Sequence, residues 1–170
     1  DAPKMTGTRT PEIPKGYSYD FINAEVIANR LQVKNGRLVL PDGMSYSILI
    51  LPEQVHMTME VLEKIMKLVK AGATVVGPRP ETVPGLNNWE KKNITMNHLS
   101  GELWGASDGK KIFEHSYGKG KVIWGISADE ILREKLIESD FSFTGPSEID
   151  YIHRTTEMGE IYFLRNESEE

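Results

Sequence analysis

A strand–helix–strand unit between residues 46 and 76 constrains the fold of this chain more than any other feature. The strand Tyr46–Leu51 ends in an unbroken apolar run, which is typical of a strand covered on both faces. Thr58 can cap the helix that follows, and Gly72 can terminate it. The strand Ala73–Val76 then returns. Because such crossovers are almost always parallel and right-handed, we predict a mostly parallel sheet.

Shorter patterns predict elements on either side of this unit. Asn35-Gly36 supplies the positive φ angles of a type I′ turn and therefore predicts a hairpin. Ser127 begins a capping-box pattern that predicts a further helix. Periodicity and capping together predict a strand at 17–22, a helix from 24 to about 30, hairpin strands at 31–34 and 37–40, a helix between 89 and 104, strands at 111–117 and 121–124, a helix from 128 to about 138, and a hairpin of 150–156 with 160–165.

Composition restricts the class of partner. The 170 residues suit one domain with a real core, and a net charge of −5 without any basic run argues against nucleic-acid and anionic-membrane partners. The absence of cysteine excludes disulfides and thiolate chemistry. No apolar run approaches the roughly 18 residues of a membrane helix. Since the chain begins at Asp1 and ends in a polar tail, we expect a piece of a longer protein.

The loops after the apolar strands lack the motifs of cofactor sites. A dinucleotide site needs GxGxxG, whereas the loop after Leu51 contains no glycine. The loop Gly77–Pro80 contains two prolines, which have no backbone N–H to offer a phosphate. Neither GxSxG nor HExxH occurs. We therefore predict no catalytic residue, cofactor or metal, and a structural or solvent-exposed role for each histidine: His56, His98, His115 and His153.

Three charged residues remain candidates for contact with a substrate. Asp20 and Glu53 lie near the ends of predicted strands, and glycoside hydrolysis requires only two carboxyl groups. Arg79 stands between two prolines, and its guanidinium suits an anion. A salt bridge within the protein is the alternative for Arg79. The candidate substrate-binding residues are therefore Asp20, Glu53 and Arg79.

Four stretches together resemble one part of the large bacterial α-L-rhamnosidases of glycoside hydrolase family 106. They are GYSYDFINAEVI (16–27), VKNGRLVLPDGMSYSILILP (33–52), LVKAGATVVGPRP (68–80) and IDYIHRTTEMGEIYFLRN (149–166). The middle portion is also similar to the amidotransferase-like domains that accompany catalytic barrels in other glycosidases. The amidotransferase nucleophile is missing.

The resemblance implies a multidomain parent that hydrolyses terminal α-L-rhamnosides of plant polysaccharides and is periplasmic or extracellular. Its catalytic carboxylates would lie in a (β/α)₈ barrel outside these residues, so no catalytic residue maps onto this numbering. The implied fold is α/β, a flavodoxin-like or amidotransferase-like three-layer domain with a mostly parallel sheet at 17–148, plus β-hairpins. An extended lead-in at 1–16 would precede it. Residues 149–170 would form a hairpin and polar tail that open a β-rich module.

We therefore expect a non-catalytic accessory domain that packs against the catalytic barrel and the β-rich modules of its parent chain. One alternative is a carbohydrate-binding module for oligosaccharides that contain rhamnose. Another is an independent α/β enzyme with a carboxylate site. A piece of a larger protein should also expose an apolar patch beyond the few hundred Å² usual for a monomer.

Overall fold

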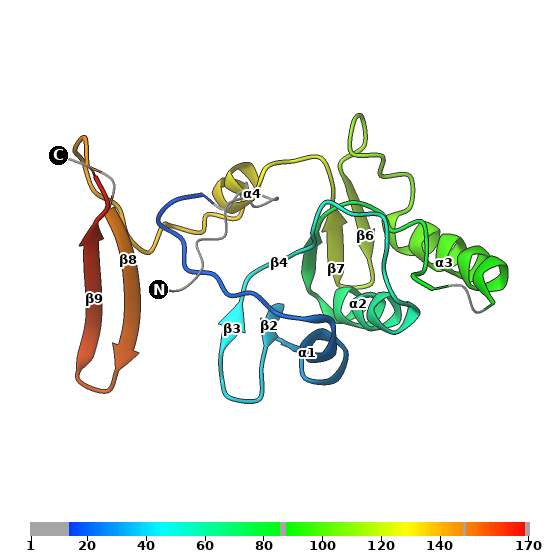
Figure 1. Ribbon diagram of the computed structural model, residues 1–170, viewed down its shortest axis with the longest axis horizontal. Helices are drawn as coiled ribbons and strands as arrows, with labels where there is room; N and C mark the ends of the chain where they lie inside the picture. The colour runs from blue at the N-terminus through cyan, green and yellow to red at the C-terminus, as the bar shows by residue number, and fades with distance from the viewer. Residues whose placement is uncertain (1–13, 86–87, 148, 169–170) are drawn as a thin grey trace.

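The computed structural model describes residues 14–85, 88–147 and 149–168. An α/β body occupies one end of the molecule, and a two-stranded hairpin stands apart at the other (Figure 1). The predicted mixture of helices and strands is confirmed, whereas most of the predicted lead-in lies outside the described residues. The elements are α1 (Ala24–Asn29), β1 (Gln32–Lys34), β2 (Arg37–Val39), β3 (Ser45–Tyr46), β4 (Leu49–Ile50), α2 (Met59–Ala71), β5 (Thr74–Val76), α3 (Trp89–Trp104), β6 (Glu114–Tyr117), β7 (Gly120–Ile123), α4 (Ala128–Glu134), β8 (Ile149–Thr156) and β9 (Gly159–Asn166).

The largest sheet of the body has four strands in the order β4-β5-β7-β6. Strands β4, β5 and β7 run parallel, and β6 is antiparallel to β7. The predicted crossover through α2 is therefore confirmed as a parallel pair. The sheet as a whole is mixed, because the turn at Gly118–Lys119 returns the chain directly beside β6.

The predicted strand Tyr46–Leu51 is wrong as a single element. Its first part, β3, pairs with β2 in a separate antiparallel sheet of the order β1-β2-β3, while β4 pairs with β5. The Arg37 guanidinium donates to the Ser47 hydroxyl (2.7 Å) and the Ser45 carbonyl (3.2 Å). These hydrogen bonds hold residues 45–47 beside β2 in the β1-β2-β3 sheet. The chain therefore bends before β4 enters the four-stranded sheet.

The predicted strand at 17–22 is also wrong, because this segment is irregular. Its contacts are made by side chains: the Tyr17 hydroxyl donates to the Ile137 carbonyl (3.1 Å). Tyr19 and Phe21 pack edge to face with their ring centroids 5.5 Å apart. The alternation of aromatic residues in 17–22 matches the pattern of a half-buried strand. Among the described residues, however, no strand forms a ladder with this segment.

Helix boundaries follow the predicted caps. The Thr58 hydroxyl accepts from the Val61 N–H, and Gly72 terminates α2 at φ 124°. Helix α3 ends at Trp104, as predicted. The capping box at Ser127 is present, but α4 stops at Glu134 rather than near 138. Leu136 takes a φ of 53°, outside the helical region, which explains the earlier end.

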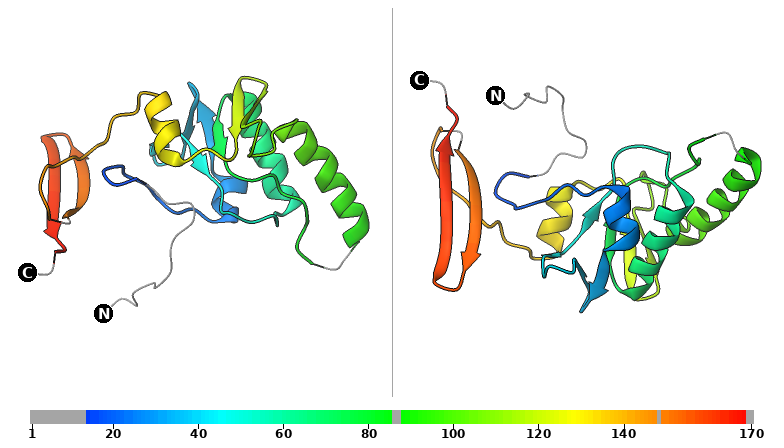
Figure 2. Two further views of the ribbon diagram at one scale, coloured as in Figure 1. Left: turned by 90° about the horizontal axis from the view of Figure 1, so that it is seen from above. Right: turned by 60° about the horizontal axis from the view of Figure 1, so that its bottom comes forward.

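The two faces of the four-stranded sheet bury different clusters. Val75 and Val122 pack with residues of α2 and α3, including Leu62 and Trp104. Their neighbours in the strands, Val76 and Ile123, pack with Ile131 of α4. Successive strand residues point to opposite faces, so helices cover both sides (Figure 2).

The predicted C-terminal hairpin is confirmed. Strands β8 and β9 pair over their whole length, from Ile149 opposite Asn166 to Thr156 opposite Gly159. One face of the hairpin contacts Phe141. The centroid of the Phe141 ring lies 5.0 Å from that of the Tyr151 ring and 6.3 Å from that of the Tyr162 ring. In the described part of the chain, no helix has the length and apolar character needed to cross a membrane.

Candidate functional site

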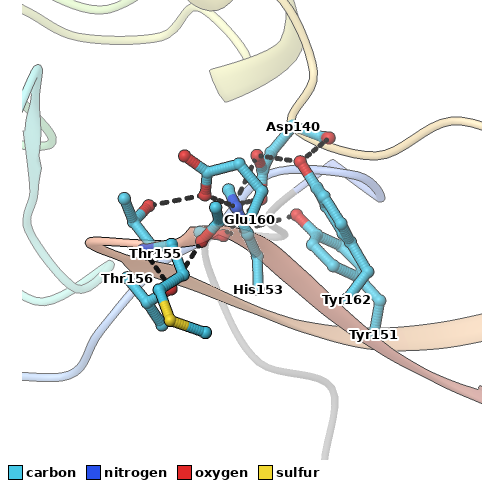
Figure 3. A network of polar contacts seen from close by, with 10 residues as sticks. Asp140, Tyr151, His153, Thr155, Thr156, Glu160 and Tyr162 are labelled. Atoms are coloured by element: carbon cyan, nitrogen blue, oxygen red, sulfur yellow. Dashed lines mark hydrogen bonds and ion pairs between the residues drawn. The ribbon is translucent and has the colours of Figure 1, made fainter.

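The densest polar cluster of the described residues surrounds His153 on β8 (Figure 3). The His153 Nδ1 lies 2.8 Å from the Asp140 Oδ1, and its Nε2 lies 2.5 Å from the Glu160 Oε2. The Tyr162 ring stacks on the imidazole with centroids 4.2 Å apart and planes only 8° from parallel. One imidazole thus bridges two carboxylates. We call this group, Asp140, His153, Glu160 and Tyr162, the histidine clamp.

The clamp joins the segment after α4 to both strands of the hairpin, and a hydrogen bond from Ser18 links it to a segment that is distant in the sequence. Hairpin register places Tyr162 opposite His153, and Glu160 opposite Thr155. The Thr155 hydroxyl donates to the Glu160 carboxylate (2.8 Å). Asp140 comes from the segment after α4 and also accepts a hydrogen bond from the Ser18 hydroxyl (3.0 Å). The clamp therefore fastens the hairpin to the rest of the chain.

Charge favours the protonated imidazole. Burial lowers the pKa of His153, but hydrogen bonds to Glu160 and Asp140 outweigh this effect and raise the pKa above its ordinary value. Hydrogen bonds from Thr155 and then from His153 lower the pKa of Glu160. Since both ring nitrogens are engaged with carboxylates, the imidazole has no free lone pair for use as a general base. The arrangement is suited to holding segments together.

Sequence reasoning predicted a structural or exposed role for His153 and missed its partners. The register of the hairpin could have placed Glu160 and Tyr162 near it, because residues two apart along a strand share a face. Nothing in the sequence pointed to Asp140, which reaches the clamp through tertiary packing.

The three predicted substrate-binding residues lie in three different environments. Asp20 lines an open hollow of about 540 Å³ together with Phe21, Arg30 and Tyr46. Glu53 lines another of about 400 Å³, with no residue in common with the first. Arg79 lines neither hollow. The structure therefore does not bring these residues together.

In the first hollow, Asp20 serves as an acceptor for Tyr46. The Tyr46 hydroxyl donates to the Asp20 carboxylate at 2.7 Å. Burial, together with this hydrogen bond and the charge of Asp20, raises the pKa of Tyr46 to about 12. The phenol is therefore a fixed donor near neutral pH and takes no part in proton transfer.

The second hollow lies at the carboxyl ends of the parallel strands. Glu53 and His56 follow β4, Pro78 follows β5 and Trp124 follows β7. In open α/β sheets this edge commonly holds ligands. His56 is engaged with the Thr82 hydroxyl, 2.5 Å from its Nδ1. The hollow thus combines a carboxylate with the edge of an indole ring.

The Gly77–Pro80 loop is used to anchor helix α3. The Trp104 Nε1–H donates to the Gly77 carbonyl (3.1 Å). The Arg79 guanidinium donates to the Ser100 hydroxyl (3.0 Å) and the Asn97 carbonyl (2.8 Å). Among the described residues, the partners of Arg79 are therefore neutral groups of α3 rather than the carboxylate of a salt bridge.

Other polar groups in the described residues have structural partners. The His115 Nδ1 lies 2.9 Å from the Leu103 carbonyl oxygen and links β6 to α3. Within residues 14–85, 88–147 and 149–168, no three His, Asp or Glu side chains gather as a metal site would require.

The known proteins that this chain resembles are glycoside hydrolases. The sequence model of glycoside hydrolase family 106, described as alpha-L-rhamnosidase, matches residues 1–170. A protein of Formosa agariphila named "Putative beta-glucuronidase" is 37% identical over 161 residues. That match covers 94% of this chain and 13% of the relative.

The solved structure of a rhamnosidase from Novosphingobium sp. PP1Y superposes with a TM-score of 0.79 at 32% identity. The match covers 91% of this chain and 15% of that structure. The chain therefore spans about one seventh of the length of these relatives. Because the family model covers its whole length, the chain belongs to glycoside hydrolase family 106, the alpha-L-rhamnosidase family.

Proposed function

We propose that this chain is a non-catalytic accessory domain of a longer glycoside hydrolase of the alpha-L-rhamnosidase family. The observation that carries the proposal is the separation of the candidate carboxylates, because Asp20 and Glu53 line different hollows. A glycosidase of the usual kind needs two carboxyl groups on either side of the scissile bond, about 5–10 Å apart. Neither hollow offers that pair.

Two carboxyl groups whose pKa values are lowered support the same proposal. Backbone N–H groups of Ile112, Lys111 and Lys110 donate to Asp108 (3.0, 2.8 and 2.9 Å) and lower its pKa to about 2. The pKa of Glu160 is lowered too. A catalytic general acid needs the opposite, a raised pKa that keeps its proton near neutral pH. Neither group is therefore suited to act as the general acid.

The role that remains is mechanical. Helices on both faces of the β4-β5-β7-β6 sheet support an amidotransferase-like ancestry for the body, in which the fold is kept and the nucleophile is gone. Such a domain would pack against the catalytic barrel and β-rich modules of the parent chain and set their orientation. The relatives' length, about seven times that of this chain, leaves room for those modules.

A hydrolysis assay tests this proposal directly. The purified chain is incubated with an aryl α-L-rhamnoside and with an aryl β-D-glucuronide, because the relatives' names point to two sugars. We expect no chromophore release from either. Turnover that disappears in Asp20→Asn or Glu53→Gln would contradict the proposal and favour an independent α/β enzyme.

A carbohydrate-binding module is the second candidate, favoured by the hollow that combines Glu53 with Trp124. Calorimetric titration with L-rhamnose and rhamnogalacturonan fragments separates the two roles, and we expect no saturable heat. A saturating signal that Glu53→Gln abolishes and Asp20→Asn preserves would establish sugar binding at this hollow. Asp20→Asn is the matched control, since it removes a carboxylate from the other hollow.

A further inference from the structure

The β8–β9 hairpin has one face on which, among the described residues, no other element packs. Residues directly opposite each other in an antiparallel pair share a face, and Ile152 pairs with Phe163 while Arg154 pairs with Ile161. Ile152 is 56% exposed, Phe163 61% and Ile161 43%. We call this face, formed by Ile152, Arg154, Ile161 and Phe163, the uncovered face. The opposite face carries the histidine clamp.

The edges of the hairpin lack partners as well. Within the described residues, the sheet contains two strands only, and no third strand pairs with either. An isolated two-stranded hairpin is marginally stable in water, and three strands or a packed apolar face are needed for independent stability. The clamp supplies contacts on one face. The other face and the free edges still present a template for further strands.

The size of the uncovered face indicates what kind of partner fits it. Eight residues per strand give a length of about 26 Å and, at two strands wide, an area of roughly 260 Å². A stable interface between separate proteins buries about 800 Å² on each partner. This face alone is therefore too small for a stable interface with a free partner or a second copy. A covering segment in the same polypeptide does not have to meet that requirement, because its association is intramolecular.

We propose that the uncovered face and the free edges of β8–β9 are covered by β-strands from another part of the same, longer glycoside hydrolase chain. This inference rests on the proposed function, since the relatives are about seven times longer than these residues. The hairpin then belongs structurally to a larger sheet. The clamp at Asp140 links that sheet to the segment that follows α4.

Cysteine labelling tests the inference, and these 170 residues contain no cysteine of their own. Ile152→Cys and Phe163→Cys place a thiol on the uncovered face. Met158→Cys is the matched control, because Met158 is 97% exposed at the tip of the same hairpin. Each variant is made both in this chain and in the full-length hydrolase, and maleimide uptake is followed on the peptide by mass spectrometry.

In this chain all three thiols should react at similar rates. In the full-length enzyme, labelling at 152 and 163 should slow roughly 100-fold or more, because it must wait for local opening, while labelling at 158 stays fast. Equal rates in the two proteins, or equal slowing at all three positions, would overturn the proposal. So would rates in the short chain that fall with protein concentration, since a second copy would then be the cover.

Hydrogen exchange distinguishes strands from other covers. Amides of β9 that point away from β8 should gain protection in the full-length enzyme. If they remain unprotected while the thiols are slow, a helix or loop covers the face and strand addition is ruled out. None of these outcomes depends on hydrolysis by the short chain, so this inference and the proposed function fail on separate measurements.

Discussion

In the α/β body, Leu62, Ile65 and Trp104 are completely buried, whereas in the β8–β9 hairpin Ile152 and Phe163 expose more than half of their side-chain surface. The body packs helices on both faces of its sheet and forms a closed core. Among the described residues, the hairpin contacts the rest of the chain through the clamp, Phe141 and Ser18. One chain therefore combines a unit that buries its apolar residues in a core with an element that leaves several of them exposed.

The largest expected difference between the regions comes from truncating one large side chain in each. Trp104→Ala removes a side chain that is 0% exposed and donates to the Gly77 carbonyl. We expect it to lower the free energy of unfolding by about 3–5 kcal/mol. Phe163→Ala, at an exposed site, should change it by no more than about 0.5 kcal/mol. Urea unfolding of this chain measures both, and comparable losses would mean that the hairpin is packed after all.

Two glycines with nearly equal φ angles give a sharper test. Gly77 has φ 140° and Gly159 has φ 141°. An added Cβ at 77 would lie 2.7 Å from the Leu51 Cβ, whereas one at 159 would meet nothing within 4 Å.

Both Gly→Ala variants should incur similar backbone strain, so their difference isolates packing. We expect Gly77→Ala to cost about 1–3 kcal/mol more than Gly159→Ala. Thermal unfolding of the pair checks this expectation. Equal costs would show that the loop after β5 yields as easily as the tip of the hairpin.

The smallest expected effect is a dependence of hairpin stability on pH. The pKa of folded His153 lies above its ordinary 6.5, so its contribution is complete below pH 6.5 and is lost as pH rises through the raised value. The pKa of folded Glu160 lies below its ordinary 4.5, so its contribution is complete above pH 4.5 and is lost as pH falls through the lowered value.

The clamp should therefore hold the hairpin best between pH 4.5 and 6.5. Amide protection factors in β8 and β9, relative to those in α2, are expected to decrease toward alkaline pH. His153→Gln cannot titrate and should remove this dependence. A decrease of the same size in the variant would assign the effect to another group.

The parts of the fold that sequence predicted are those governed by local chemistry. Asn35 and Gly36 both take positive φ angles and form the expected turn. Thr58 and Ser127 cap their helices as their side chains allow. Each of these features depends on contacts within a few residues, so the neighbouring sequence is sufficient to specify it.

The parts that sequence did not predict depend on distant partners. Hydrogen bonds from Arg37 fix the split of Tyr46–Leu51 between two sheets. Residues 17–22 are irregular, and no neighbouring strand among the described residues pairs with them. The candidate site shows the same limit. The histidine clamp requires Asp140 beside a hairpin that begins nine residues later, and no periodicity specifies that contact.

The clamp also has a consequence for synthesis on the ribosome. Ser18 and Asp140 are 122 positions apart, and Glu160 follows later still. The body can collapse while translation continues, since domains generally fold as units from the N-terminal end. The segment around Ser18 must wait for Asp140 and Tyr151 to emerge before these contacts form. The clamp closes only after Glu160 follows, so docking of the hairpin is the last of these steps.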